Sequence, residues 1–119
     1  MLHHPLIMGM HASFQDSKSL YLLLPLFQGG ELWSRIYEKE DDWGLPEDQA
    51  RFYGACVLEA LGYMHERHVC YRDLKPDNVL IDSKGYGIVI DMGLAKVVMQ
   101  KTFTMCGKFH ACVQCLGFH

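Results

Sequence analysis

The chain has 119 residues, which is enough for one small domain. Half of its residues are hydrophobic, as in globular proteins, and its formal net charge of −3 gives no reason to expect a nucleic acid or an anionic membrane as a partner. The longest apolar run, residues 20–27, is too short to span a bilayer, and no secretory signal is recognisable at the start. We therefore expect a cytoplasmic protein.

The first half of the chain predicts a strand and two helices. Residues 20–24 form an apolar run that reads as a short buried strand, ended by Pro25. Gly29 and Gly30 predict a turn, and residues 31–37 a short helix. Residues 41–44 then predict a loop.

A longer helix is predicted over residues 46–66. Pro46 suits the first helical position, and the acidic residues 47 and 48 complement the positive end of the helix dipole. Apolar residues recur with the period of one helical face, at positions 52/53, 57, 61 and 64/65. With no later helix in the chain to cover it, much of this face is expected to be exposed.

Two short strands, residues 79–81 and 88–90, follow this helix and are joined by a turn at residues 82–85. The predicted order is strand, helix, helix, loop and hairpin. This order indicates an α+β fold.

Polar residues that suit phosphoryl transfer stand on both sides of this hairpin. The segment Tyr-Arg-Asp-Leu-Lys-Pro-Asp-Asn occupies residues 71–78, and Asp91-Met92-Gly93 begins 13 residues after Asn78. One acid of such a set can receive a hydroxyl proton, while an amide and a second acid can hold Mg²⁺ over nucleotide phosphates. A single Asp in a loop is usually a turn residue, but the whole pattern at this spacing is specific.

This pattern resembles the catalytic loop and metal-binding turn of eukaryotic protein kinases. The resemblance implies ATP and Mg²⁺ as cofactors, Asp73 as the catalytic base, and Lys75 as a neutraliser of charge on the transferring phosphoryl group. Asn78 and Asp91 would be the Mg²⁺ ligands. A Lys two residues after the catalytic Asp is typical of serine/threonine kinases, so the implied substrate is a Ser or Thr hydroxyl of a protein.

Other segments are similar to the AGC group of kinases, and to its cyclic-nucleotide-dependent members in particular. Residues 24–27 would be the hinge that pairs with adenine, Glu31 would meet the ribose and a basic residue of the peptide substrate, and Leu80 would lie under the adenine. Tyr71 in place of the more common His is usual for this group. The implied nucleotide-binding residues are Leu24, Pro25, Phe27, Glu31, Asn78, Leu80 and Asp91.

Residues 101–107 resemble the activation loop of the same group. Thr104 falls at the regulatory phosphothreonine, whose phosphate would pair with Arg72 and Lys96. Met92 replaces the usual Phe between Asp91 and Gly93, a change that should keep the packing with small loss.

The resemblance covers residues 3–107, and residues 108–119 read as an unrelated C-terminal tail. Cys112 and Cys115 in that tail could be taken for a metal or redox element, but zinc usually needs two ligand pairs, so none is predicted. The five cysteines show no disulfide framework and are expected to be reduced.

We therefore expect a partial protein-kinase-like fold with the end of the small lobe, the hinge, the first large-lobe helices and the catalytic hairpin. No glycine-rich phosphate loop and no accompanying strand Lys is found in the 119 residues, so the chain by itself is expected to be inactive. The alternative is a non-catalytic, pseudokinase-like or truncated product that acts by protein binding. A small-molecule phosphotransferase of kinase-like fold is disfavoured by Lys75, the 29–31 segment and the activation loop.

Overall fold

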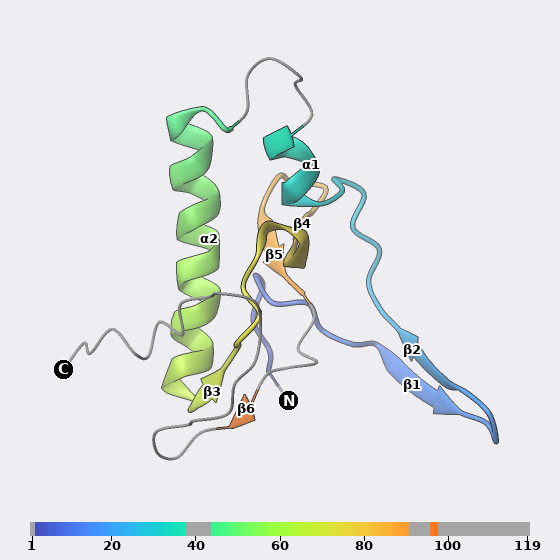
Figure 1. Ribbon diagram of the computed structural model, residues 1–119. Helices are drawn as coiled ribbons and strands as arrows, with labels where there is room; N and C mark the ends of the chain where they lie inside the picture. The colour runs from blue at the N-terminus through green and yellow to red at the C-terminus, as the bar shows by residue number, and fades with distance from the viewer. Residues whose placement is uncertain (1, 38–43, 91–95, 98–119) are drawn as a thin grey trace.

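The computed structural model describes residues 2–37, 44–90 and 96–97 (Figure 1). Its strands pair as antiparallel ribbons, β1 with β2, β3 with β6, and β4 with β5. The predicted α+β class is confirmed. The elements in chain order are β1 (Ala12–Gln15), β2 (Leu20–Leu23), α1 (Leu32–Tyr37), α2 (Glu47–Glu66), β3 (Val69–Cys70), the 3₁₀-helix η1 (Pro76–Asn78), β4 (Val79–Ile81), β5 (Gly87–Val89) and β6 (Lys96–Val97).

Helix α2 agrees with the prediction to within one residue. It begins at Glu47, with Pro46 as the residue before the first turn, and both acidic residues of that turn are where the helix dipole favours them. It ends at Glu66, and the N–H groups of Arg67 and His68 then donate to the carbonyl oxygens of residues 64 and 65, at 3.0 and 2.9 Å. Neither α1 nor α2, the helices of the described part of the chain, is long and apolar enough to cross a membrane.

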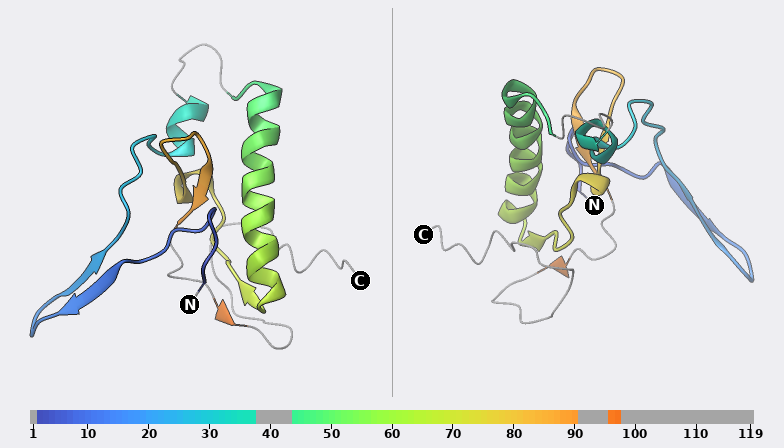
Figure 2. Two further views of the ribbon diagram at one scale, coloured as in Figure 1. Left: turned by 180° about the vertical axis from the view of Figure 1, so that it is seen from behind. Right: turned by 45° about the horizontal axis from the view of Figure 1, so that its top comes forward.

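The core lies between α2, the β4–β5 hairpin and the N-terminal segment (Figure 2). Ile7 makes a parallel bridge to Val89, whose N–H donates to the carbonyl oxygen of Leu6 at 2.9 Å and whose carbonyl accepts from Met8 at the same distance. The central cluster consists of Ile7, Ala60, Leu61, Met64, Tyr71 and Val89.

The predicted exposure of the α2 apolar face is wrong. Leu61 and Met64 are buried, because β5, β3 and the N-terminal segment cover this side of the helix. The face is also rotated slightly from the predicted one. Cys56 and Ala60 are buried within it, while Phe52 is exposed at its edge.

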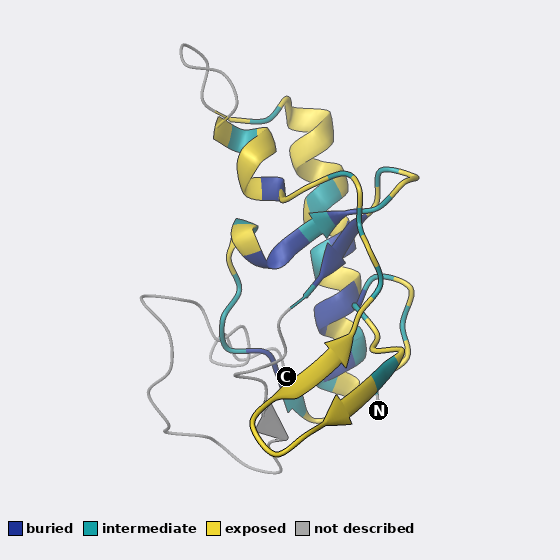
Figure 3. Ribbon diagram, turned by 90° about the vertical axis from the view of Figure 1, so that its right-hand side faces the viewer, coloured by how far each residue is buried: buried dark blue, intermediate teal, exposed yellow. Residues whose placement is uncertain are grey.

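Strand β2 is where the predicted strand begins, but the prediction that it is buried is wrong. All four of its residues are exposed, and Leu20 keeps 65% of its surface accessible. Among the described strands β2 pairs with β1 alone, in the register Phe14↔Tyr21 and Ser13↔Leu22, and this ribbon projects from the rest of the molecule (Figure 1). Figure 3 shows the two strands as mostly exposed. A continuous apolar run is typical of a strand buried on both faces, but no described element covers either face here.

The β4–β5 hairpin is the buried ribbon of the molecule. Val79 pairs with Val89 and Ile81 with Gly87, so β5 begins one residue earlier than predicted. The Asp82 carboxylate shapes the turn, since its Oδ1 accepts the N–H groups of Lys84 and Tyr86, both at 2.8 Å. The polar residues of the candidate site stand directly before this hairpin, which begins at Val79.

Candidate active site

The catalytic loop predicted from the sequence runs from β3 through η1 into β4, and Tyr71 anchors its first residues. Tyr71 is only 2% exposed, and its hydroxyl donates to the carbonyl oxygen of Ile90. The N–H of Ile90 donates in turn to the carbonyl oxygen of Asn78 at 3.0 Å. The peptide groups of Ile90, the residue before Asp91, are therefore bound to both ends of the loop.

Arg72, the next residue, has a left-handed backbone with φ of 69°. This conformation costs a non-glycine residue about 1–2 kcal/mol and is found most often where the surrounding structure requires it. It turns the chain sharply between the buried Tyr71 and the partly exposed Asp73. The turn directs the loop from the core towards the surface.

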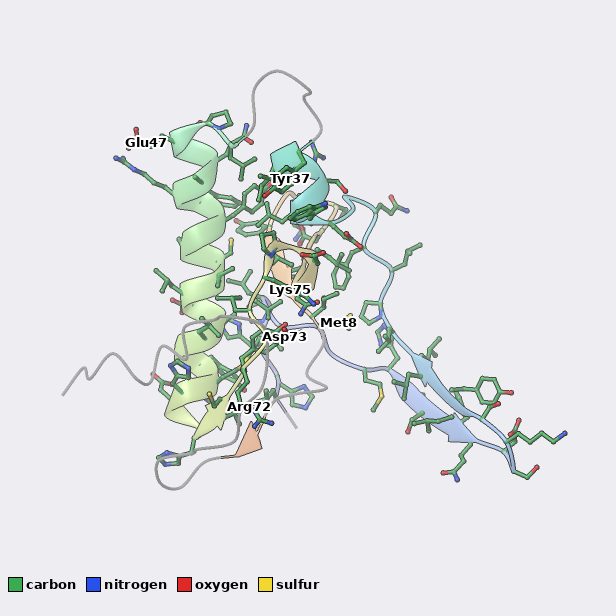
Figure 4. The ribbon with its side chains drawn as sticks, in the orientation of Figure 1. Met8, Tyr37, Glu47, Arg72, Asp73 and Lys75 are labelled. Carbon is green, nitrogen blue, oxygen red and sulfur yellow. The ribbon has the colours of Figure 1, made fainter. Side chains whose placement is uncertain are left out.

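The structure brings Asp73, Lys75 and Asn78 together (Figure 4 labels the first two). The amide nitrogen of Asn78 donates to the backbone carbonyl of Asp73 at 2.9 Å and to its Oδ2 at 3.0 Å. Lys75 Nζ lies 3.5 Å from the same Oδ2. Asn78 is 6% exposed, whereas the Lys75 side chain is 46% exposed, so a buried amide holds the acid while the lysine faces solvent.

These contacts do not involve Asp73 Oδ1 or the side-chain oxygen of Asn78. Among the described residues, Asn78 and Lys75 both contact Asp73 through Oδ2, so Oδ1 can accept a proton from a hydroxyl group. The bonds of Asn78 are made by its nitrogen, which orients the side chain and leaves its oxygen for a cation. Carboxylate and amide oxygens are the ligands that Mg²⁺ prefers, so the oriented Asn78 oxygen fits this ion, while Asp91, the second predicted ligand, is outside the described residues.

The segment after the predicted hinge pairs with the catalytic hairpin. Glu31 forms an antiparallel bridge with Leu80, and the Gly29 N–H donates to the Ile81 carbonyl oxygen at 2.9 Å. Two residues predicted at the nucleotide, Glu31 and Leu80, therefore lie side by side. The sequence predicted only a turn at the two glycines, because nothing local indicates their partner strand.

The remaining predicted residues are either apart from this group or outside the described residues. Leu24, Pro25 and Phe27 lie on the connection between β2 and α1, where Leu24 is exposed and the other two are half-buried. Within residues 2–37 and 44–90, no hydrogen bond or ion pair joins them to Asp73. Asp91, Thr104 and the Lys96 side chain are outside the described residues, whereas the half-buried Arg72 is within them.

The sequence profile of the protein kinase domain matches residues 1–112 of this chain. The chain belongs to the protein kinase family. Helix α2, the loop with Asp73 and Asn78, and the β4–β5 hairpin all lie within the matched residues.

Its curated relatives are serine/threonine kinases of the AGC group, which confirms the predicted group. The serine/threonine-protein kinase sgk-1 of Caenorhabditis elegans is 44% identical over 107 residues, which are 87% of this chain and 22% of that protein. The cAMP-dependent protein kinase catalytic subunit of Dictyostelium discoideum is 41% identical over 106 residues, 89% of this chain and 16% of that protein. A cGMP-dependent protein kinase of Drosophila melanogaster (isozyme 2 forms cD5/T2) is 42% identical over 103 residues, 85% of this chain and 11% of that protein. The chain thus spans about a fifth of these relatives or less, and covers part of a kinase domain.

Sequence reasoning missed the hydrogen bond from Tyr71 to Ile90 and the ribbon between residues 29–31 and β4. The first had a weak signal, since a tyrosine next to a charged loop needs a partner for its hydroxyl when it is buried. The second had none, because Gly29 and Ile81 are far apart in the sequence.

Proposed function

We propose that this chain supplies the catalytic loop of a serine/threonine protein kinase, which transfers the γ-phosphoryl group of ATP to a Ser or Thr hydroxyl of a protein. The observation that carries this proposal is the Asp73 carboxylate, held by the buried Asn78 amide and flanked by Lys75. The family and the AGC relatives support it. The cytoplasm stays its predicted location.

Asp73 acts as the base. Its Oδ2 is bound by Asn78 and Lys75, and its Oδ1 orients the substrate hydroxyl and receives its proton. The hydroxyl oxygen forms a bond to the γ-phosphorus while the bond from that phosphorus to the β-phosphate oxygen breaks, and ADP leaves. Lys75, whose ammonium group is near the acid, neutralises charge on the transferring group.

Asn78 and Asp91 would hold Mg²⁺, which would neutralise charge on the nucleotide phosphates when bound. Asn78 meets this role with an oriented side chain, because both hydrogen bonds of its nitrogen are to Asp73. Asp91 follows Ile90, whose two peptide groups are bound by Tyr71 and Asn78. These bonds hold Ile90, the residue before Asp91, next to Asn78.

The rest of the nucleotide site comes from the hinge and its neighbours. Pro25 and Phe27 pair with adenine through backbone groups, next to Leu24, while Leu80 packs under the ring. Glu31, exposed and bridged to Leu80, contacts the ribose and a basic residue of the peptide substrate. We further propose that phosphorylated Thr104 pairs with Arg72 and Lys96 and orders the activation loop.

Peptide phosphorylation tests this function. The protein in its full natural length is incubated with ATP, Mg²⁺ and basic Ser-containing peptides, and compared with its Asp73→Asn and Asp77→Asn variants. Loss of the base should lower kcat about 10²- to 10⁴-fold. Asp77 is an exposed carboxylate four positions along the same loop, so its variant should keep the wild-type rate.

Equal activity of the Asp73→Asn variant and the wild type would contradict the role of Asp73. A folded wild type that transfers no phosphate to any Ser or Thr peptide would contradict the proposed function and favour the non-catalytic, protein-binding alternative.

A further inference from the structure

Gly29 lies so close to Ile81 that no other residue fits at this position. A Cβ atom added to Gly29 would be 2.5 Å from the carbonyl oxygen of Ile81, 2.7 Å from its Cβ and 2.8 Å from its Cγ2. The first two atoms belong to the backbone or are attached directly to it, so no rotamer change removes the overlap. Any side chain at Gly29 must therefore move the two segments apart.

The requirement is for space and not for conformational freedom. Gly30, with φ of 73°, is in the left-handed region that favours glycine, whereas Gly29 is not among the residues with positive φ. Its φ therefore does not exclude alanine, whereas the contact with Ile81 excludes the extra carbon. The two glycines therefore meet different requirements: Gly29 allows the close contact with Ile81, and Gly30 adopts a positive φ.

The contact is part of a short backbone ladder on the edge of β4. The Gly29 N–H donates to the Ile81 carbonyl, the Ile81 N–H donates to the Gly30 carbonyl at the same 2.9 Å, and Glu31 pairs with Leu80. The other edge of β4 pairs with β5. Strand β4 thus lies between the segment of residues 29–31 and β5, and a shift of that segment changes the position of Glu31 relative to Leu80.

β4 also connects this ladder to the polar residues of the site. It begins one residue after Asn78, whose amide holds Asp73. The ladder therefore sets the distance between Glu31 and Leu80, which we assign to the nucleotide, and Asn78, which we assign to the metal ion.

We propose that Gly29 is a positioning residue for ATP: its missing side chain lets residues 29–31 pair with β4 and so aligns the ribose and adenine contacts with the metal ligand. This role rests on the proposed kinase function. Glu31 is also assigned to a basic residue of the peptide, so loss of the ladder should change ATP kinetics with any peptide, and peptide kinetics only for a peptide that has this basic residue.

The test compares Gly29→Ala with Gly62→Ala in the protein in its full natural length. Gly62 is an exposed glycine of α2 where an added Cβ meets no atom within 4 Å, so the same substitution there should leave kinetics unchanged. Displacement of a bound reactant by about 1 Å can cost about 10²-fold in rate. We expect Gly29→Ala to raise KM for ATP about tenfold or more, with KM within about twofold for a peptide that lacks the basic residue assigned to Glu31.

The outcomes separate the two proposals. A wild type without phosphate transfer removes the kinase function and, with it, the role of Gly29. An active wild type whose Gly29→Ala variant keeps its KM for ATP overturns the role of Gly29 alone, as does an equal rise in Gly62→Ala.

Amide hydrogen exchange of the wild type provides a second measurement, should Gly29→Ala not fold. The Gly29 and Ile81 amides should exchange slowly and at similar rates, because both belong to the same ladder. Their exchange should become slower still when ATP and Mg²⁺ are added. Rapid exchange of both amides in the presence of ATP and Mg²⁺ would overturn the ladder on which the proposal depends.

Discussion

At the scale of single residues, polar groups of the catalytic loop are held by few but specific bonds. Tyr71 is one such residue in the core. It is 2% exposed, and its hydroxyl donates a hydrogen bond to the carbonyl oxygen of Ile90. Buried polar groups without partners are costly, so such a bond contributes more than the same bond at the surface.

Tyr71→Phe should lower the free energy of unfolding by about 1–2 kcal/mol, because it leaves the Ile90 carbonyl without this donor. Chemical denaturation of the variant and the wild type measures the difference. Tyr21→Phe is the matched control, since the Tyr21 hydroxyl donates to Asp16 Oδ2 at 3.0 Å on the exposed ribbon. Its cost should be within about 0.5 kcal/mol. Equal losses in both variants would contradict the argument from burial.

Asp16 should make the β1–β2 turn sensitive to acid. The backbone N–H of Lys18, the Tyr21 hydroxyl and the backbone N–H of Ser19 all donate to its carboxylate and hold its pKa below the usual range. A depressed folded-state pKa stabilises the turn above the unfolded-state pKa, and this stabilisation is lost as pH falls through the folded-state pKa.

Titration of the Asp16 carboxyl carbon by NMR, with exchange of the Ser19 amide, measures this effect. The Asp16→Asn variant should show no such dependence in the acid range. An Asp16 pKa at or above that of an unstructured aspartate would contradict the expectation.

At the scale of elements, the end of α2 contains a backbone conformation that its residue does not favour. His68 has φ of 58° at the position where helices most often have glycine. The residue is exposed, so its side chain contributes little packing to offset this cost.

His68→Gly should therefore raise the free energy of unfolding by about 0.5–1 kcal/mol, as judged by thermal or chemical denaturation. Glu59→Gly provides the contrast. Glu59 is an exposed residue in the middle of α2, where glycine should lower the free energy of unfolding by about 1 kcal/mol. A loss of stability in His68→Gly would show that the histidine has a role that its exposure does not indicate.

At the scale of the whole molecule, apolar surface is distributed unevenly. α2 and the β4–β5 hairpin bury a common core, whereas the β1–β2 ribbon exposes Phe14, Leu20 and Leu22 at 61%, 65% and 53%. Exposed apolar strands with free edges favour association between copies.

The 119-residue polypeptide should therefore self-associate with rising concentration, as seen by size-exclusion chromatography with light scattering. Leu20→Lys with Leu22→Lys, on one face of β2, should reduce this association. Leu58→Lys should not, since Leu58 is an isolated exposed residue of α2. A concentration-independent monomer would contradict the prediction.

The same polypeptide, assayed alone, should transfer no measurable phosphate. Its sequence contains the catalytic loop but neither a glycine-rich phosphate loop nor the strand Lys that accompanies it. Transfer that is lost in Asp73→Asn would overturn this expectation.

The sequence by itself determined the family, the group, α2 and the hairpin, and it identified Asp73, Lys75 and Asn78 as a set. It could do so because helix periodicity, strand composition and the loop motif are local properties of the chain. The division at residue 107 and the roles of Asp91 and Thr104 stay predictions from that pattern.

Only the tertiary structure decided which surfaces are covered and which distant groups meet. Two apolar strands differ in burial, since β5 packs against α2 and is buried, while β2 is exposed. The Tyr71–Ile90 bond joins residues 19 positions apart, and the Gly29–Ile81 contact joins the hinge side to the catalytic hairpin. Burial and close contact depend on what the fold places opposite each residue, and the residue itself carries no local signal of that neighbour.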